Sequence, residues 1–179
     1  DKTNYPYVYT DENGADHYFY KKTDSDTTQY LDEDSLGLEL EVTDTEYIIT
    51  NKDNEKLHFA KSTNQLTKLV NSTGQTITVS YVSGTHYINA LNDENGNTLS
   101  VSYNGGVSSI TDPSERSTVF GYDSEGEYLT SITTPDGNIV RYTYNSKGML
   151  TKVTNVDGTY ITFAYSDNGS RGVKTVQEF

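Results

Sequence analysis

Apolar and polar residues alternate over short stretches of this chain, and each stretch ends at a turn signal. In four stretches every second residue is apolar and the last is tyrosine: Ile77-Val79-Tyr81, Leu99-Val101-Tyr103, Val140-Tyr142-Tyr144 and Ile161-Phe163-Tyr165. A period of two places such side chains on one face of a β-strand. The intervening Asn-Gly and Asp-Gly pairs favour tight turns and leave no room for helices. The pattern predicts an all-β chain built from hairpins.

A longer period is superimposed on this alternation. From Tyr122 to Tyr144, and again to Tyr165, the same order of motifs recurs: a turn with glycine, a Leu-Thr-x-Ile/Val strand, an Asp-Gly turn and a second strand. The tyrosines at 81, 103, 122, 144 and 165 are spaced by 22, 19, 22 and 21 residues. Such a period is typical of repeat architectures, in which neighbouring units share one core. We expect the repeat to depend on Tyr81, Tyr103, Tyr122, Asp123, Gly126, Gly137, Tyr144, Gly148, Gly158 and Tyr165.

The first strand of each unit departs from strict alternation. Its two apolar residues are three apart, as in Leu129 and Ile132 or Leu150 and Val153. Either a β-bulge lies between them or the leucine sits just outside the strand. Stacked units would form an antiparallel β-meander of repeated hairpins, a curled and partly open sheet, because strand twist accumulates. Its open edges would allow self-association.

The N-terminal quarter is less regular. Residues 1–46 are expected to hold a hairpin (5–22), a solvated acidic loop (21–35) and a first meander strand (36–42) whose Glu39 and Glu41 face water. Residues 47–179 are expected to form repeats of about 19–22 residues.

Composition narrows the range of functions. Among 179 residues there are 16 Tyr, no Cys and a formal net charge of -13. This charge disfavours nucleic acid and anionic membranes as partners, because both require clustered Lys and Arg. The absence of Cys excludes disulfides, thiolate zinc sites and cysteine nucleophiles. No apolar run reaches transmembrane length, so no membrane insertion is expected, and the abrupt termini suggest an excised piece of a longer chain.

No catalytic, metal or cofactor site is expected. His17, His58 and His86 share no metal-ligand spacing, and no G-x-S-x-G motif supports a Ser-His-Asp hydrolase. Residues 11–14 and 93–96 have the sequence Asp-Glu-Asn-Gly, half of a calcium loop, but turn chemistry explains them better. The cluster Asp32-Glu33-Asp34 is a weak cation site or, more simply, part of a solvated loop.

Aromatic residues outside the regular repeat provide an alternative function. Tyr7, Tyr9, Tyr18 and Tyr20 are the candidates for binding a glycan or a host-cell ligand, because exposed rings on a sheet can stack on sugar rings. The tyrosines of the regular repeat are better explained by packing between strands.

The repeat resembles that of the YD-repeat, or RHS-repeat, family. Tyr122-Asp-Ser-Glu-Gly126, Leu129-Thr-Ser-Ile132 and Pro135-Asp-Gly137 are similar to its unit nearly in full, and the likeness is good from about Tyr103 to Tyr165. The segment before the repeats is similar to that of Gram-positive wall-associated members. The resemblance implies a non-enzymatic structural module of an extracellular or cell-wall bacterial protein. Its partners would be further repeats and a C-terminal cargo or toxin domain enclosed by the shell. The family's aspartyl self-cleavage motif is missing, since Asp112-Pro113 continues into Ser114-Glu115.

Overall fold

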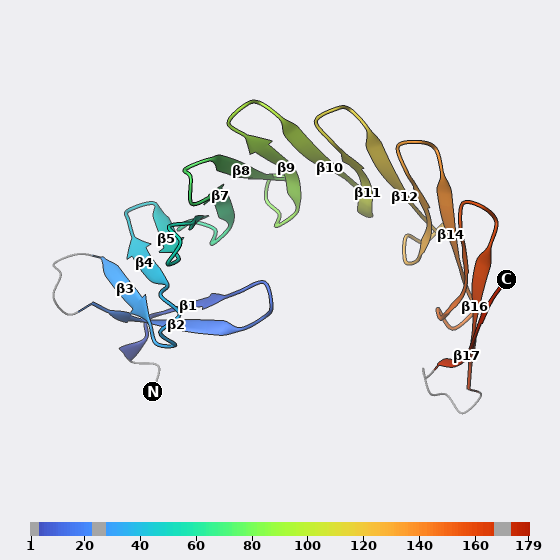
Figure 1. The fold of residues 1–179 in the computed structure, drawn as a ribbon, viewed down its shortest axis with the longest axis horizontal. Coiled ribbons are helices and arrows are strands. Elements are labelled where there is room, and N and C mark those ends of the chain that lie inside the picture. The colour runs from blue at the N-terminus through green and yellow to red at the C-terminus, as the bar shows by residue number, and fades with distance from the viewer. Residues whose placement is uncertain (1–3, 23–27, 167–172) are drawn as a thin grey trace. The chain divides into compact units, whose positions relative to one another are not determined.

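In the computed structural model, which describes residues 4–22, 28–166 and 173–179, the chain forms two compact units, Asp1–Thr98 and Leu99–Phe179. Within each unit every strand pairs antiparallel with the next along the chain (Figure 1). The first unit contains β1 (Tyr7–Thr10), β2 (Asp16–Lys21), β3 (Gln29–Asp32), β4 (Glu39–Val42), β5 (Glu46–Thr50), β6 (Lys56–Ala60), β7 (Leu66–Val70), β8 (Thr76–Tyr81) and β9 (Ile88–Asp93). The second contains β10 (Thr98–Asn104), β11 (Gly106–Thr111), β12 (Ser117–Tyr122), β13 (Leu129–Thr133), β14 (Ile139–Tyr144), β15 (Leu150–Thr154), β16 (Tyr160–Tyr165) and β17 (Val173–Glu178).

This arrangement confirms the predicted all-β antiparallel meander. Among the described strands of either unit, no pairing joins the first strand to the last, so neither unit closes into a barrel. The boundary between the two units along the chain falls between Thr98 and Leu99. The division expected at residue 46 separates an irregular region from regular repeats, and it stays a prediction.

Most hairpin turns share one backbone geometry. In each, the N–H of the first residue donates to the carbonyl four positions on, and the N–H of the fourth residue donates back to the first carbonyl. The fourth residue has a positive φ, as in Gly137 (79°) and Gly158 (87°). This is a type I turn followed by a left-handed residue, which is a common way to connect two antiparallel strands. The Asn-Gly and Asp-Gly signals in the sequence therefore predicted the turns correctly.

Side chains at the first turn position hold these turns together. The Oδ1 atom of Asp93 accepts the backbone N–H groups of Asn95 and Asn97, at 2.9 and 2.8 Å. The same pair of bonds forms at Asp11, Asn51, Asn71, Asp112 and Asn145. The turn interpretation of both Asp-Glu-Asn-Gly stretches thus has a direct structural basis, because their aspartates bind their own backbone.

The first unit has a small apolar core. Phe19 in β2 is fully buried, and it packs with Leu40, Val42 and Ile49 from β4 and β5. The β1–β2 hairpin lies across the face of β4, β5 and β6, so this end of the sheet curls onto itself (Figure 1). The curl confirms the predicted curled, partly open sheet.

Two details of the N-terminal prediction are wrong. The region expected to be a solvated loop contains strand β3, and Asp32 at its end is buried because its carboxylate accepts the N–H groups of Leu36 and Leu38. The strand expected from residue 36 begins at Glu39, since Ser35 and Gly37 adopt positive φ. The exposure of Glu39 and Glu41 is as predicted.

One turn uses a strained residue where most others use glycine. Glu115 has φ of 63° at the left-handed position of the turn that begins at Asp112. Glu115→Gly should therefore raise the free energy of unfolding by about 0.5–1 kcal/mol, as glycine adopts this conformation without the Cβ clash. Chemical denaturation followed by circular dichroism would measure the change.

The matched control is Gly137→Ala at the equivalent position of another turn. Its added Cβ would have nothing within 4 Å, so any loss of stability comes from backbone strain rather than crowding. If both variants shift stability in the same direction, the strain argument is wrong.

Candidate functional site

A β-bulge accompanies the closing tyrosine of each repeat. In the β12–β13 pair, Gly121 faces Ser131 and Tyr122 faces Leu129, which leaves Thr130 as the extra residue. The same register shift occurs at Tyr81, Tyr103, Tyr144 and Tyr165, and at Phe59. Of the two alternatives for the leucine spacing, the bulge is therefore confirmed, and the leucine is the first residue of its strand.

At four of these bulges a tyrosine hydroxyl from the neighbouring strand binds the carbonyl of the first bulge residue. The Tyr144 hydroxyl donates to the backbone carbonyl of Leu129 at 3.0 Å, fifteen residues earlier. The same bond, at the same offset, joins Tyr81 to Leu66, Tyr122 to Val107 and Tyr165 to Leu150. Burial raises the pKa of Tyr81 and Tyr144 above the ordinary value. We call this interaction the tyrosine latch.

A threonine at the extra residue adds a second bond that the sequence analysis missed. The Thr130 hydroxyl donates to the carbonyl of Gly121 at 3.2 Å, across the bulge. Thr67 and Thr151 make the equivalent bonds to His58 and Thr143. The sequence signal for this bond was the Leu-Thr-x-Ile/Val motif, because its threonine is the extra residue of the bulge.

The remaining repeat residues lie in the turns. Asp123 accepts the N–H groups of Glu127 and Tyr128 at 2.8 and 3.2 Å. Gly126, Gly137 and Gly158 supply left-handed turn positions with open space around them. Gly148 differs, because the Tyr128 side chain lies against it and would overlap any Cβ.

The structure divides the four candidate ligand-binding tyrosines between two faces of the β1–β2 hairpin. Tyr7 and Tyr9 point inward, because their cross-strand partners are the buried Phe19 and His17. Tyr18 and Tyr20 lie on the other face, where both rings meet the Tyr5 ring edge-on at 6.3 and 6.4 Å. The four side chains therefore form no single platform for a sugar ring.

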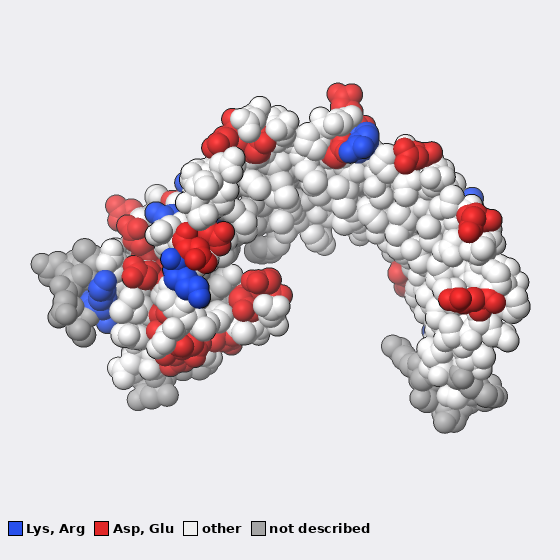
Figure 2. All heavy atoms as spheres, viewed as in Figure 1, with Lys and Arg blue, Asp and Glu red and all other residues white. Residues whose placement is uncertain are grey.

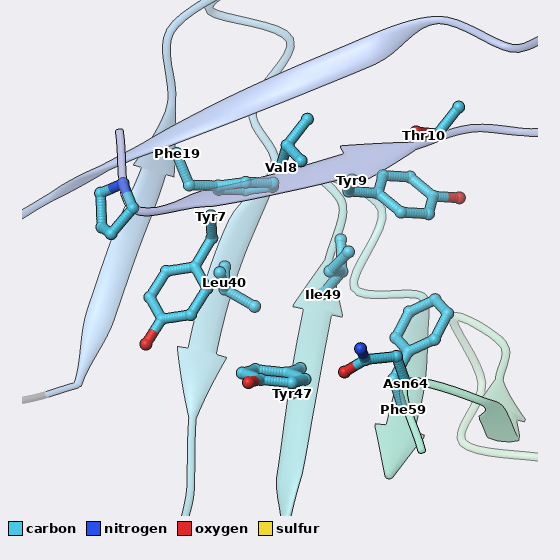
Figure 3. Close-up of a pocket in the computed structure, with 11 residues that line it drawn as sticks. Tyr7, Val8, Tyr9, Thr10, Phe19, Leu40, Tyr47, Ile49, Phe59 and Asn64 are labelled. Carbon is cyan, nitrogen blue, oxygen red and sulfur yellow. The ribbon is translucent and has the colours of Figure 1, made fainter. Parts of the chain in front are cut away.

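The inward tyrosines line a groove of about 420 Å³ beside β1 (Figure 3). Its floor carries Tyr47, Ile49 and Phe59 from β5 and β6. Tyr7 is packed against Tyr47 at a ring distance of 5.6 Å, and Tyr9 against Phe59 at 6.0 Å. The groove is thus lined mainly by apolar and aromatic side chains.

A second, acidic pocket of about 380 Å³ begins on the other side of Tyr9. Its lining includes Asp11, Glu12 and Glu55, and it contains no Lys or Arg. His17 also lines it, with ring nitrogens 3.3 Å from the Asp11 carboxylate and 3.5 Å from that of Asp34. The His17 Nδ1 atom is buried and makes no hydrogen bond with the described residues.

The described side chains around His17 do not form a metal site. The two carboxylates approach opposite nitrogens of the His17 ring, so they do not converge on one ion. In the described residues no group of three or more His, Asp or Glu side chains is placed to hold a metal. His58 lies in β6 near Glu46, and His86 lies near Gln65, so the three histidines are not brought together.

Comparison with known proteins identifies the family. A family model described as Teneurin YD-shell matches residues 34–178, which is most of the chain. The chain belongs to this family. The match confirms the resemblance to YD repeats. Curated proteins give no significant match. Within the described part of the chain, no helix has the length and apolarity needed to span a membrane.

Removing one latch should weaken the repeat measurably. Tyr144→Phe deletes the hydroxyl and leaves the Leu129 carbonyl without its side-chain donor, so we expect a loss of about 1 kcal/mol in the free energy of unfolding. Tyr142→Phe is the control. Tyr142 is a half-buried tyrosine of the same strand, and its hydroxyl makes no hydrogen bond with the described residues. Equal losses in the two variants would contradict a specific role for the latch.

The turn aspartates should make stability depend on acid pH. The Asn97 side chain, together with backbone N–H groups, holds the pKa of Asp93 below its ordinary value, and Arg116 does the same for Asp112. Depressed carboxylate pKa values stabilise the fold above about pH 4, and this contribution is lost as the pH falls through the folded-state values.

Asp93→Asn tests this dependence, since asparagine already fills the same position at Asn71 and Asn145. The variant keeps the acceptor but does not titrate. Its melting temperature should therefore fall less than that of the parent between about pH 7 and pH 3. The neighbouring exposed Glu94→Gln variant should behave as the parent does, and an identical acid response in all three would refute the prediction.

Proposed function

We propose that this chain is a structural module of an extracellular YD-repeat protein, part of a β-shell that encloses a cargo. The observation that carries the proposal is the tyrosine latch, because the same bond at the same fifteen-residue offset recurs in four hairpins, and each bond ends at the bulge that pairs its hairpin with the preceding strand. A sheet built from such repeats can form the wall of a shell, since its stability comes from interactions between neighbouring repeats. YD-shell repeats occur in extracellular and surface proteins and are not typically catalytic.

The finer parts of the proposal rest on the sequence resemblance. They are a bacterial, Gram-positive, cell-wall-associated parent protein and an enclosed toxin or other C-terminal cargo. A glycan-binding role for Tyr7, Tyr9, Tyr18 and Tyr20 is less favoured, since no single face presents them together.

The exposed edge of β17 supports addition of further repeats. Val173 and Val176 are 52% and 55% exposed, whereas their counterparts Leu150 and Val153 in β15 are half-buried between neighbouring strands. Val173 also faces Tyr165 across a bulge, as Leu150 faces Tyr144. A further strand at this edge would cover both valines and could place a tyrosine on the Val173 carbonyl.

An added half-repeat tests whether the module propagates. Residues 157–165 copied after Phe179 would place a tyrosine fifteen residues after Val173, the offset of every observed latch. We expect this extension to raise the melting temperature, because it buries the exposed edge and adds a latch.

Two controls separate stacking from simple lengthening. An extension with phenylalanine in place of its last tyrosine should give a smaller rise, and one with its apolar and polar residues shuffled should give none. If the intact extension does not stabilise the chain more than the shuffled one, the chain does not propagate as a shell wall.

A further inference from the structure

The outer edge of β1 is open for hydrogen bonding. At the end of the β1–β2 hairpin the Asp11 N–H donates to the Ala15 carbonyl. Hydrogen-bonded pairs recur at every second residue of an antiparallel ladder, so Tyr9 and Tyr7 are the next residues that bond to β2. The N–H and carbonyl of Val8 therefore point away from β2, and within the described residues β1 pairs with β2 alone. Val8 is also 55% exposed.

This free edge runs along the apolar groove. Both the backbone of β1 and the rings of Tyr7 and Tyr9 line it, and Tyr47 and Phe59 form its floor (Figure 3). A strand added beside β1 would direct every second side chain into the groove, at the level of Tyr7 and of Tyr9. The groove therefore combines backbone hydrogen bonding with apolar side-chain sites, which is the arrangement that binds extended peptides by strand addition.

The charge of the protein near the groove indicates which side chain a bound strand should carry beyond these apolar positions, toward the C-terminal end of β1. The acidic pocket begins at Tyr9 and continues to Asp11 and Glu12, so it lies at the C-terminal end of β1. Glu12 is exposed, and no hydrogen bond or ion pair of its carboxylate is found in the described residues. Acidic side chains also gather densely over this unit (Figure 2). A Lys or Arg side chain would be favoured there.

We propose that this groove binds an extended polypeptide segment, which adds antiparallel to β1. The segment carries a basic residue opposite Asp11 and apolar residues opposite Tyr9 and Tyr7, that is, a basic-x-apolar-x-apolar pattern. A peptide fits better than a glycan, because the free backbone groups of Val8 match another backbone. In addition, the rings of Tyr7 and Tyr9 are already packed against Tyr47 and Phe59, so they offer no open flat platform. This proposal does not depend on the shell role.

The test is a fluorescence anisotropy titration of the full 179-residue chain with a labelled, capped peptide, Lys-Thr-Val-Thr-Phe-Thr. We expect saturable binding. Methylating the backbone nitrogen of the fourth residue, which would face Val8, should weaken binding by about tenfold or more because a backbone hydrogen bond is lost and a clash is added. The shuffled peptide Lys-Val-Phe-Thr-Thr-Thr should bind no better than the methylated one.

Protein variants locate the site. Val8→Pro removes the outward N–H but none of the β1–β2 bonds, so it should keep the hairpin and weaken binding by about tenfold. Val8→Thr keeps the N–H and should bind as the parent does, and melting curves would check that both variants are folded. Glu12→Lys should weaken binding of this peptide but restore it when the peptide's lysine is replaced by glutamate.

Several outcomes would overturn the proposal. One is an absence of binding by the alternating peptide. Others are unchanged binding after Val8→Pro or after peptide methylation, which would place the peptide elsewhere. Displacement of the peptide by a hexasaccharide of N-acetylglucosamine, with direct binding of that sugar, would instead assign the groove to glycans.

Discussion

The fold depends on one repeated interaction, the bond from a tyrosine hydroxyl to the carbonyl at the start of a bulge. A bulge interrupts the regular ladder and leaves backbone groups without their usual partners. An unpaired carbonyl in a half-buried sheet is costly, and the latch satisfies it with a side chain from the next strand. The bulge and the tyrosine therefore belong together, and each latch ties the two strands of its hairpin together at the position where the ladder to the preceding strand is weakest.

Much of this architecture follows from the sequence because its elements are local. Alternation fixed the faces of the strands, and glycine with asparagine or aspartate fixed the turns, since these effects act within a few residues. The spacing of Leu129 and Ile132 left two alternatives, a bulge or a leucine outside the strand, and the structure has the bulge. The sequence did not reveal which backbone carbonyl each tyrosine hydroxyl binds. That bond joins residues fifteen apart on neighbouring strands, and only the register of the sheet brings them together.

The N-terminal region shows the opposite case, in which tertiary contacts override local patterns. Residues 29–32 read as part of an acidic loop, yet β3 forms there because β2 and β4 supply partners on both sides. Asp32 can be buried because its carboxylate accepts hydrogen bonds from the N–H groups of Leu36 and Leu38. Similarly, Tyr7 and Tyr18 look equivalent in the sequence, but the curl of the sheet buries one face of the hairpin and leaves the other open. The groove beside β1 arises from this curl, so no motif could have indicated it.

The latch also accounts for where the repeats of this chain differ in length. From the first bulge residue to the latching tyrosine the distance is always fifteen residues, so the turn between them has a fixed length. The loops that follow the tyrosines lie outside this constraint. The steps from Tyr81 to Ile88, Tyr103 to Val107, Tyr122 to Leu129 and Tyr144 to Leu150 are 7, 4, 7 and 6 residues, and they account for the whole irregularity of the tyrosine spacing. The differences in length among these repeats are thus confined, within each unit, to one of the two margins of its sheet, and the turns at the opposite margin keep a constant length.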